Sequence, residues 1–193
     1  MKIIAMEVGY IATNCYIVVN EETHHGVIID PGGDAGRIME AVQKENLTVD
    51  AIFLTHGHGD HIMALAEVAE NRAPVYISKE DAPMLTDPVG SLAAYIGGGA
   101  LKKAADKFYA DGDEVEAAGI KFKVLATPGH TPGGVCLLTG GVYSAAIPFL
   151  PNQSAERIFP AVHTNSFCSP LKKKFFRLTT TLNFYRATGL LLR

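Results

Sequence analysis

Several features are scarce or missing in this chain, and each absence argues against one class of protein. No apolar run approaches the roughly 20 residues of a membrane-spanning helix. Glu7 interrupts the short apolar run at the N-terminus, so no signal peptide is expected. The three cysteines, Cys15, Cys136 and Cys168, are far apart and form no CxxC pair. They predict reduced thiols in a cytoplasmic protein rather than a disulfide framework.

The sequence also lacks the short motifs of several large enzyme classes. It contains no GxGxxG dinucleotide fingerprint, no P-loop and no Ser, His and Asp in the order of a serine hydrolase. What remains is a chain of 193 residues, 48% hydrophobic and 19% charged, which is typical of a globular protein with a substantial core.

Acidic residues are almost absent from the last part of the chain. Residues 1–145 contain 10 Lys+Arg and 19 Asp+Glu, a net charge of −9. Residues 146–193 contain 7 Lys+Arg and a single acid, Glu156, a net charge of +6. Either this basic tail binds an acidic partner or its charge has another origin. The stretch LKKKFF is too short for a convincing nucleic-acid surface, so we expect no nucleic-acid partner and no membrane partner.

Strands and helices alternate in the first half of the chain, which predicts sheet layers covered by helices. β-Branched and apolar runs predict strands over residues 2–8, 15–20, 26–30, 50–55 and 74–78. Residues 120–130 are predicted as a strand that ends in a loop, and residues 133–145 as a hairpin. Helical spacing of apolar residues predicts helices over residues 34–46, with Asp34 as N-cap, 61–72 and 79–85.

The stretch THGHGDH, residues 55–61, places three histidines and one aspartate between a predicted strand and a predicted helix. Imidazole nitrogens and carboxylate oxygens are ligands for zinc and iron. A loop at the end of a strand can turn side chains so close in sequence toward one point, whereas a regular strand or helix cannot. The alternative is a polar surface loop that happens to be rich in histidine. The density of ligand types favours a metal site.

His130 lies in a second loop, TPGHTPGG, which also follows a predicted strand. A single loop histidine is more often just an exposed side chain. Together with His56 and His58 it would complete a three-histidine site with an open fourth position, which is the arrangement of catalytic zinc.

The order of these motifs resembles the metallo-β-lactamase superfamily, and within it the small hydrolases similar to glyoxalase II. The stretches TNCYIV, VIIDPGG, THGHGDH and TPGHTPGG follow one another as in that family, over residues 1–145. The resemblance implies an α/β fold, the four-layer αββα sandwich of the family, incomplete after residue 145. It also implies hydrolysis at a site with two metal ions, usually zinc.

The resemblance also assigns roles to single residues. It implies a first metal ion bound by His56, His58 and His130, and a second bound by Asp60 and His61. Asp60 would in addition act as the catalytic residue that orients the nucleophile. For Asp30, in VIIDPGG, two interpretations are open: a carboxylate that orients a ligand histidine, or a turn residue before Pro-Gly.

Two ligands that the family needs are missing. One is an aspartate in a GDTLF-like stretch soon after GGVYS, and the other is a histidine in a later PGHGP-like loop. Residues 146–193 contain no aspartate, and the surroundings of His163 do not match the second motif. We therefore expect this chain to bind about one metal ion, zinc or iron, instead of two.

The genetic code offers an explanation for the missing ligands. Suppose that the ancestral reading frame was shifted relative to the present one. Each ancestral codon then consisted of the last base of one present codon and the first two bases of the next. Residues 145–150 then permit Gly-Asp-Thr-Leu-Phe, and residues 184–190 permit Leu-Pro-Gly-His-Gly-Pro. We hypothesise a single-base frameshift near codons 144–146. The metallo-β-lactamase-like domain would then cover residues 1–145, and the anomalous basic tail, residues 146–193, would replace its last part.

The resemblance implies hydrolysis of a small-molecule thioester by metal-bound hydroxide, impaired in this chain by the changed tail. Two alternatives stay open. One is a persulfide dioxygenase, which uses the same scaffold with a single iron. The other is an inactive metal-binding product of a frameshifted gene.

Overall fold

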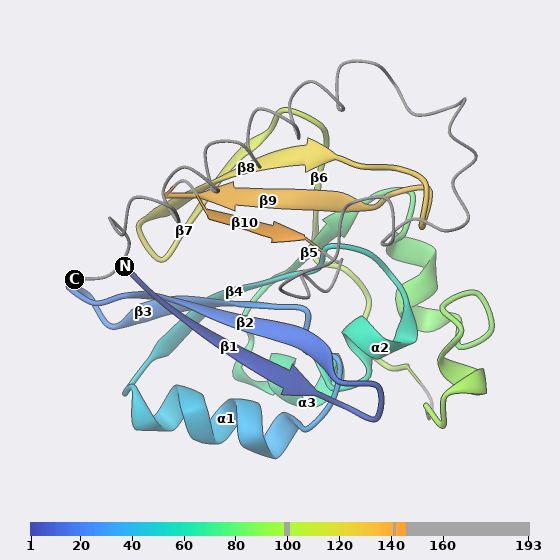
Figure 1. Ribbon diagram of the computed structural model, residues 1–193, viewed down its shortest axis with the longest axis horizontal. Coiled ribbons are helices and arrows are strands. Elements are labelled where there is room, and N and C mark those ends of the chain that lie inside the picture. The colour runs from blue at the N-terminus through green and yellow to red at the C-terminus, as the bar shows by residue number, and fades with distance from the viewer. Residues whose placement is uncertain (99–100, 141, 146–193) are drawn as a thin grey trace, which may run out of the picture. The chain divides into compact units, whose positions relative to one another are not determined.

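Two β-sheets lie face to face, and helices cover the outer face of the first sheet (Figure 1). The structure is a computed structural model that describes residues 1–98, 101–140 and 142–145. The frameshift hypothesis, the basic tail and His163 concern residues 146–193 and therefore lie outside the described residues. No helix in the described part of the chain is long and apolar enough to cross a membrane.

The first sheet has six strands, in the order β1-β2-β3-β4-β5-β6. They are β1 (Lys2–Val8), β2 (Thr13–Asn20), β3 (His25–Ile29), β4 (Thr48–Phe53), β5 (Val75–Ser78) and β6 (Lys107–Tyr109). The first three strands pair antiparallel, and β3 to β6 pair parallel. Because β3, β4 and β5 run in the same direction, the loops that follow them emerge at one edge of the sheet.

The second sheet has four antiparallel strands, in the order β10-β9-β8-β7. They are β7 (Glu114–Ala117), β8 (Ile120–Ala126), β9 (Val135–Thr139) and β10 (Val142–Ala145). The sequence predicted β8 and the β9–β10 hairpin. It did not predict β6 and β7, which are three and four residues long and rich in charged residues.

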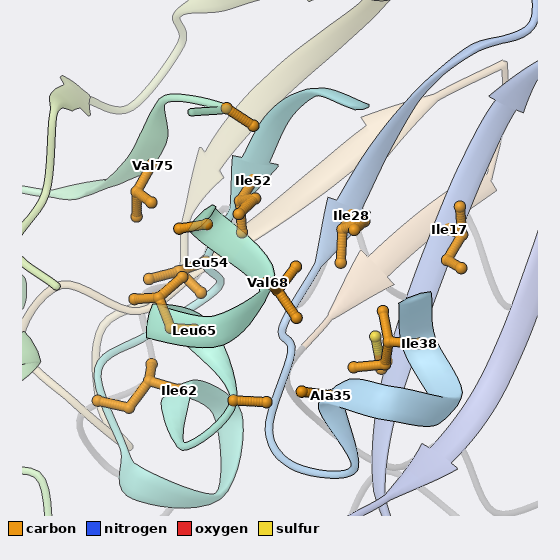
Figure 2. Packing of buried hydrophobic residues seen from close by; sticks show 14 of the residues in the cluster. Ile17, Ile28, Ala35, Ile38, Ile52, Leu54, Ile62, Leu65, Val68 and Val75 are labelled. Carbon is orange, nitrogen blue, oxygen red and sulfur yellow. The ribbon is translucent and has the colours of Figure 1, made fainter. Parts of the chain in front are cut away.

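The central strands are apolar on both faces because both faces are buried. Adjacent residues of a strand point to opposite sides, and Ile52 accordingly joins the cluster under the helices while Phe53 joins the cluster between the sheets. On the helix side, Ile17, Ile28 and Ile52 pack against Ile38, Leu65 and Val68 (Figure 2). The sheet therefore forms the middle of a three-layer arrangement of helices, first sheet and second sheet.

Phe53, the last residue of β4, anchors the end of the strand that leads into the THGHGDH loop. Its ring meets the rings of Tyr76 and Phe122 edge-on, each with centroids 5.0 Å apart. The ring of Tyr109 lies 6.4 Å away, and its hydroxyl donates a hydrogen bond to the carbonyl of Leu54. These contacts hold the backbone of β4 in place up to the histidine loop.

Helix α1 (Ala35–Lys44) forms as predicted, but Asp34 does not cap it through its side chain. Asp34 adopts a left-handed backbone conformation with φ 51°. Its carboxylate accepts hydrogen bonds from the Gly9 N–H and from Arg37 instead of from the helix N-terminus. The predicted N-cap position of Asp34 is therefore confirmed, but its side chain makes no capping hydrogen bond to the helix N-terminus.

The single helix predicted over residues 61–72 was wrong. The segment consists of α2 (Gly59–Ile62), α3 (Leu65–Val68) and the 3₁₀ turn η1 (Ala69–Asn71). The break has a hydrogen-bonding cause, since Ala64 donates its N–H to the carbonyl of Pro31 and not to a preceding turn of the helix. Residues 79–85 were also predicted as a helix, and only the 3₁₀ turn η2 (Ala82–Thr86) forms there. A third 3₁₀ turn, η3 (Ala93–Tyr95), lies against α2.

The turn Pro31-Gly32-Gly33 packs directly on the backbone of α2. A Cβ atom on Gly32 would overlap the carbonyl oxygen of Asp60 and lie 2.7 Å from the carbonyl carbon. Both partners are backbone atoms, so a side chain at position 32 cannot be accommodated by a rotamer change. The glycine is needed for this close approach between the turn and the histidine loop.

We predict that Gly32→Ala lowers the free energy of unfolding by about 3 kcal/mol or more, because the overlap forces the turn away from α2. Gly36→Ala is the matched control. Nothing lies within 4 Å of its new methyl group, and this glycine sits in helix α1. It should stabilise the chain by about 0.5–1 kcal/mol. Urea unfolding of both variants measures the difference, and equal stabilities would contradict the packing.

Candidate metal centre

Two loops bring the predicted ligands to one edge of the sheets. The first follows β4 and carries His56 and His58 before α2 begins at Gly59. The second connects β8 to β9 and carries His130. The first loop is joined directly to the start of β9, since the Val135 N–H donates a hydrogen bond to the carbonyl of Thr55. The pairing therefore links the first sheet to the second beside the histidines.

His56, His58 and His130 converge, and their ligand atoms all lie within 4.8 Å of one another. His58 Nδ1 is 2.9 Å from His130 Nε2. The ring centroid of His56 lies 4.8 Å from that of His58 and 4.9 Å from that of His130. His56 is buried, His58 is partly buried and His130 is exposed, so the cluster opens toward solvent on one side.

The histidine cluster favours neutral imidazoles, which is the form that binds metal. Burial, and then the neighbouring histidines, lower the pKa of His56 to about 2. Burial and the charge of His130 also lower the pKa of His58. The buried Nε2 of His56 has no hydrogen-bond partner among the residues that the structure describes. An unpaired nitrogen at this position fits a metal ligand, because an orphaned buried polar atom is otherwise destabilising.

Asp60 and His61 lie beside the three histidines. His61 Nε2 is 3.3 Å from Asp60 Oδ2, and the ring of His61 lies 4.1 Å from that of His56. Burial alone would raise the pKa of Asp60, but His61 and the hydroxyl of Thr13 hold it below its usual range. Thr13 Oγ1 donates to Asp60 Oδ2 over 2.9 Å. Among the described residues, the group of at least three potential ligands that could hold a metal ion consists of His56, His58 and His130, and it does not include Asp60 or His61.

Asp30 lies beside His61 and Thr55, which is the position that the first of its two interpretations requires, while His61 as a ligand stays a prediction. Its carboxylate is 1% exposed and accepts hydrogen bonds from the N–H and the hydroxyl of Thr55, at 2.8 and 2.6 Å. Asp30 Oδ2 is also 3.1 Å from His61 Nδ1. The angle of that contact falls outside a hydrogen bond, so it is a close ion pair. Asp30 thus holds both ends of the THGHGDH loop.

Sequence reasoning missed three residues at this centre: Thr13, Thr55 in its role toward Asp30, and Asp81. Asp81 is fully buried and accepts hydrogen bonds from the Gly57 and Gly133 N–H groups. It lies just after β5, at the sheet edge where the histidine loop follows β4. That position was the available signal, because polar residues after neighbouring parallel strands gather at one edge.

A comparison with known protein families identifies the superfamily of this chain. The profile of the metallo-beta-lactamase superfamily matches residues 8–142, more than half of the chain. The chain belongs to the metallo-beta-lactamase superfamily. The predicted superfamily and its mixed α/β fold class are thereby confirmed. Membership supports a hydrolase that binds a divalent metal ion.

Named relatives agree with this membership. A protein of Aquifex aeolicus is 39% identical over 139 residues, which are 71% of this chain and 64% of that protein. The probable metallo-hydrolase YqgX of Bacillus subtilis is 36% identical over 70% of this chain and 64% of its own length. The hydroxyacylglutathione hydrolase of Aliivibrio fischeri is 32% identical over 74% and 52%. The chain thus spans less than two thirds of the length of these relatives.

Solved structures of the superfamily also align with the chain. The B3 metallo-beta-lactamase BLEG-1 superposes with a TM-score of 0.67 at 33% identity, over 72% of this chain and 67% of that one. TTHA1623 in a di-iron-bound form gives 0.61 at 30%, over 81% and 82%. ETHE1 from Myxococcus xanthus gives 0.60 at 29%, over 74% and 56%.

The partners of His61 predict how the stability of the metal-free protein depends on pH. Burial lowers the pKa of His61, but the carboxylates of Asp30 and Asp60 outweigh it and raise the pKa to about 9. The folded state therefore holds this proton more tightly than the unfolded state, whose pKa is about 6.5. Its contribution is fully present below pH 6.5 and is lost as the pH rises through 9, by an amount on the order of 1–3 kcal/mol.

Urea unfolding of the metal-free chain between about pH 6 and about pH 9.5 measures this loss, since these limits lie about half a unit outside the two pKa values. His61→Gln should flatten the slope above pH 6.5. His25→Gln is the control, because it removes a surface histidine paired with Asp50 and leaves the contacts of His61 intact. A slope that survives His61→Gln would contradict this assignment.

Proposed function

We propose that this chain derives from a metal-dependent hydrolase that cleaves a small-molecule thioester. The observation that carries the proposal is the convergence of His56, His58 and His130 beside the carboxylate of Asp60. Three imidazoles with an open side toward solvent match the donor set of a catalytic metal ion, and zinc is one of the metals that this set suits. A metal ion bound there would lower the pKa of a coordinated water and polarise a substrate carbonyl.

The residues around the three histidines would prepare the site for hydrolysis. Asp60 is held ionised and oriented by Thr13 and His61, so its second oxygen can accept a proton from water or contact a second metal ion. Asp30 fixes the ring of His61 and, through Thr55, the backbone of the loop. Asp60 is therefore the residue that we propose to orient the nucleophile.

The thioester as substrate class rests on the relatives. The Aliivibrio fischeri relative is named a hydroxyacylglutathione hydrolase, and its similarity extends over 74% of this chain. We extend that chemistry to this chain as a proposal, with a small-molecule substrate and neither nucleic acid nor membrane as partner.

We further propose that hydrolysis is impaired in this chain by a frameshift near codons 144–146. The superfamily match ends at residue 142, a few residues before that point. The rival explanation is a genuine basic extension that binds an acidic partner. Sequencing the gene across codons 140–150 separates the two, since an intact frame without a lost base would exclude the frameshift.

Zinc titration of the full chain should reveal about one tightly bound ion, because only the three-histidine group is complete among the described residues. His56→Ala and His130→Ala should each abolish tight binding. His25→Ala removes a part-buried pair with Asp50 outside the three-histidine group, so this variant should bind zinc as the unmodified chain does. Two tightly bound ions per unmodified chain would contradict the proposed loss of the second site.

Inserting one base at codons 144–146 should restore thioester hydrolysis. We expect the repaired protein to cleave a hydroxyacylglutathione thioester and to bind two metal ions, while the present chain stays near background. Asp60→Asn in the repaired protein should lower kcat by about 10²–10⁴-fold, the range for a positioned proton-transfer group. Equal activity of both chains would rule out the frameshift as the cause of impairment.

Iron chemistry is the second candidate, and the di-iron form of TTHA1623 favours it. A persulfide dioxygenase would use the same scaffold with a single iron. Iron content of the purified chain, together with oxygen consumption in the presence of glutathione persulfide, separates this candidate from zinc-dependent thioester cleavage. If neither activity appears in the present chain but one appears in the repaired protein, the alternative of an inactive product of a frameshifted gene is supported.

A further inference from the structure

Asp81 is a fully buried carboxylate between β5 and η2, outside every motif that indicated the metal centre. Each of its oxygens accepts one backbone N–H. Asp81 Oδ2 lies 3.1 Å from Gly57 N, and Asp81 Oδ1 lies 2.8 Å from Gly133 N. Its own N–H donates to the hydroxyl of Ser78 over 3.3 Å, which orients the residue at the end of β5.

The two N–H groups belong to the two loops that carry the histidines. Gly57 lies between His56 and His58, and Gly133 lies three residues after His130. A Cβ atom on Gly133 would overlap the hydroxyl of Ser78 and lie 2.9 Å from Asp81 Oδ1. The glycine therefore lets the second loop approach the carboxylate closely.

We propose that Asp81 is a positioning residue that sets the distance between the two histidine loops and thereby the metal affinity of the site. The inference rests on the proposed metal centre. Its physical basis is that a buried carboxylate is stable only when both oxygens are hydrogen-bonded. Asp81 therefore holds the loop after β4 and the loop before β9 at one fixed separation, in addition to the direct hydrogen bond from Val135 to Thr55.

Asp81→Asn should weaken zinc binding by the full chain about 10–100-fold, the range for residues that orient metal ligands. The amide keeps one acceptor oxygen but turns an NH₂ group toward the other N–H, so one loop is released. In cobalt-substituted protein, the visible spectrum should change with this variant, because it reports the ligand geometry. Asp81→Glu keeps both acceptor oxygens and should recover part of the affinity.

Asp106→Asn is the matched control. Asp106, the residue before β6, also accepts a backbone N–H, from Val75 at 2.8 Å, but this contact lies at the start of β5, away from the histidines. It should lower stability without changing the zinc affinity or the cobalt spectrum. If Asp81→Asn does not unfold cooperatively, Ser78→Ala takes its place, with a smaller loss of affinity expected. Unchanged affinity and an unchanged spectrum in the folded variant would overturn the inference.

A readout without metal keeps this inference separate from the proposed function. In the metal-free chain, hydrogen exchange should speed up at the Gly57 and Gly133 amides together in Asp81→Asn, and at neither in Asp106→Asn. Unchanged protection at either glycine would overturn the role of Asp81. Failure of the unmodified chain to bind zinc, with the exchange result as expected, would instead overturn only the metal centre.

Discussion

Buried carboxylates hold the histidine loop in place, and the geometry of the centre depends on them. Asp30 accepts hydrogen bonds from Thr55 and lies beside His61, and Asp81 accepts a hydrogen bond from Gly57. A loop buried at the edge of two sheets has to pair its polar backbone groups with something other than water. Aspartates at the ends of β3 and β5 supply those partners, and the loop conformation follows from where they stand.

The same contacts divide the ligands into two electrostatic environments. Around His56, burial and other histidines dominate, so its pKa falls and the ring is neutral. Around His61, the carboxylates of Asp30 and Asp60 dominate, so its pKa rises although it is buried. Two histidines five residues apart in one motif thus have opposite protonation preferences. The difference lies in the carboxylates that surround each ring.

Most of the strands could be predicted from the sequence, because the alternation and β-branched composition of β1 to β5 are strong local signals. The short strands β6 and β7 were missed because three or four residues with charges carry almost no pattern. The helix predicted after the histidine loop was wrong, because Ala64 gives its N–H to Pro31. A hydrogen bond between segments 33 residues apart is invisible to helical periodicity.

The sequence by itself identified the superfamily and marked the histidines and the aspartate of THGHGDH and TPGHTPGG as candidate metal ligands. These properties depend only on which residues occur and in what order, so they can be read without the folded structure. Only the tertiary structure decided that the ligand atoms of His56, His58 and His130 lie within 4.8 Å of one another and that Asp81 bridges their loops. Such distances arise from the packing of the two sheets, which brings together residues more than seventy positions apart.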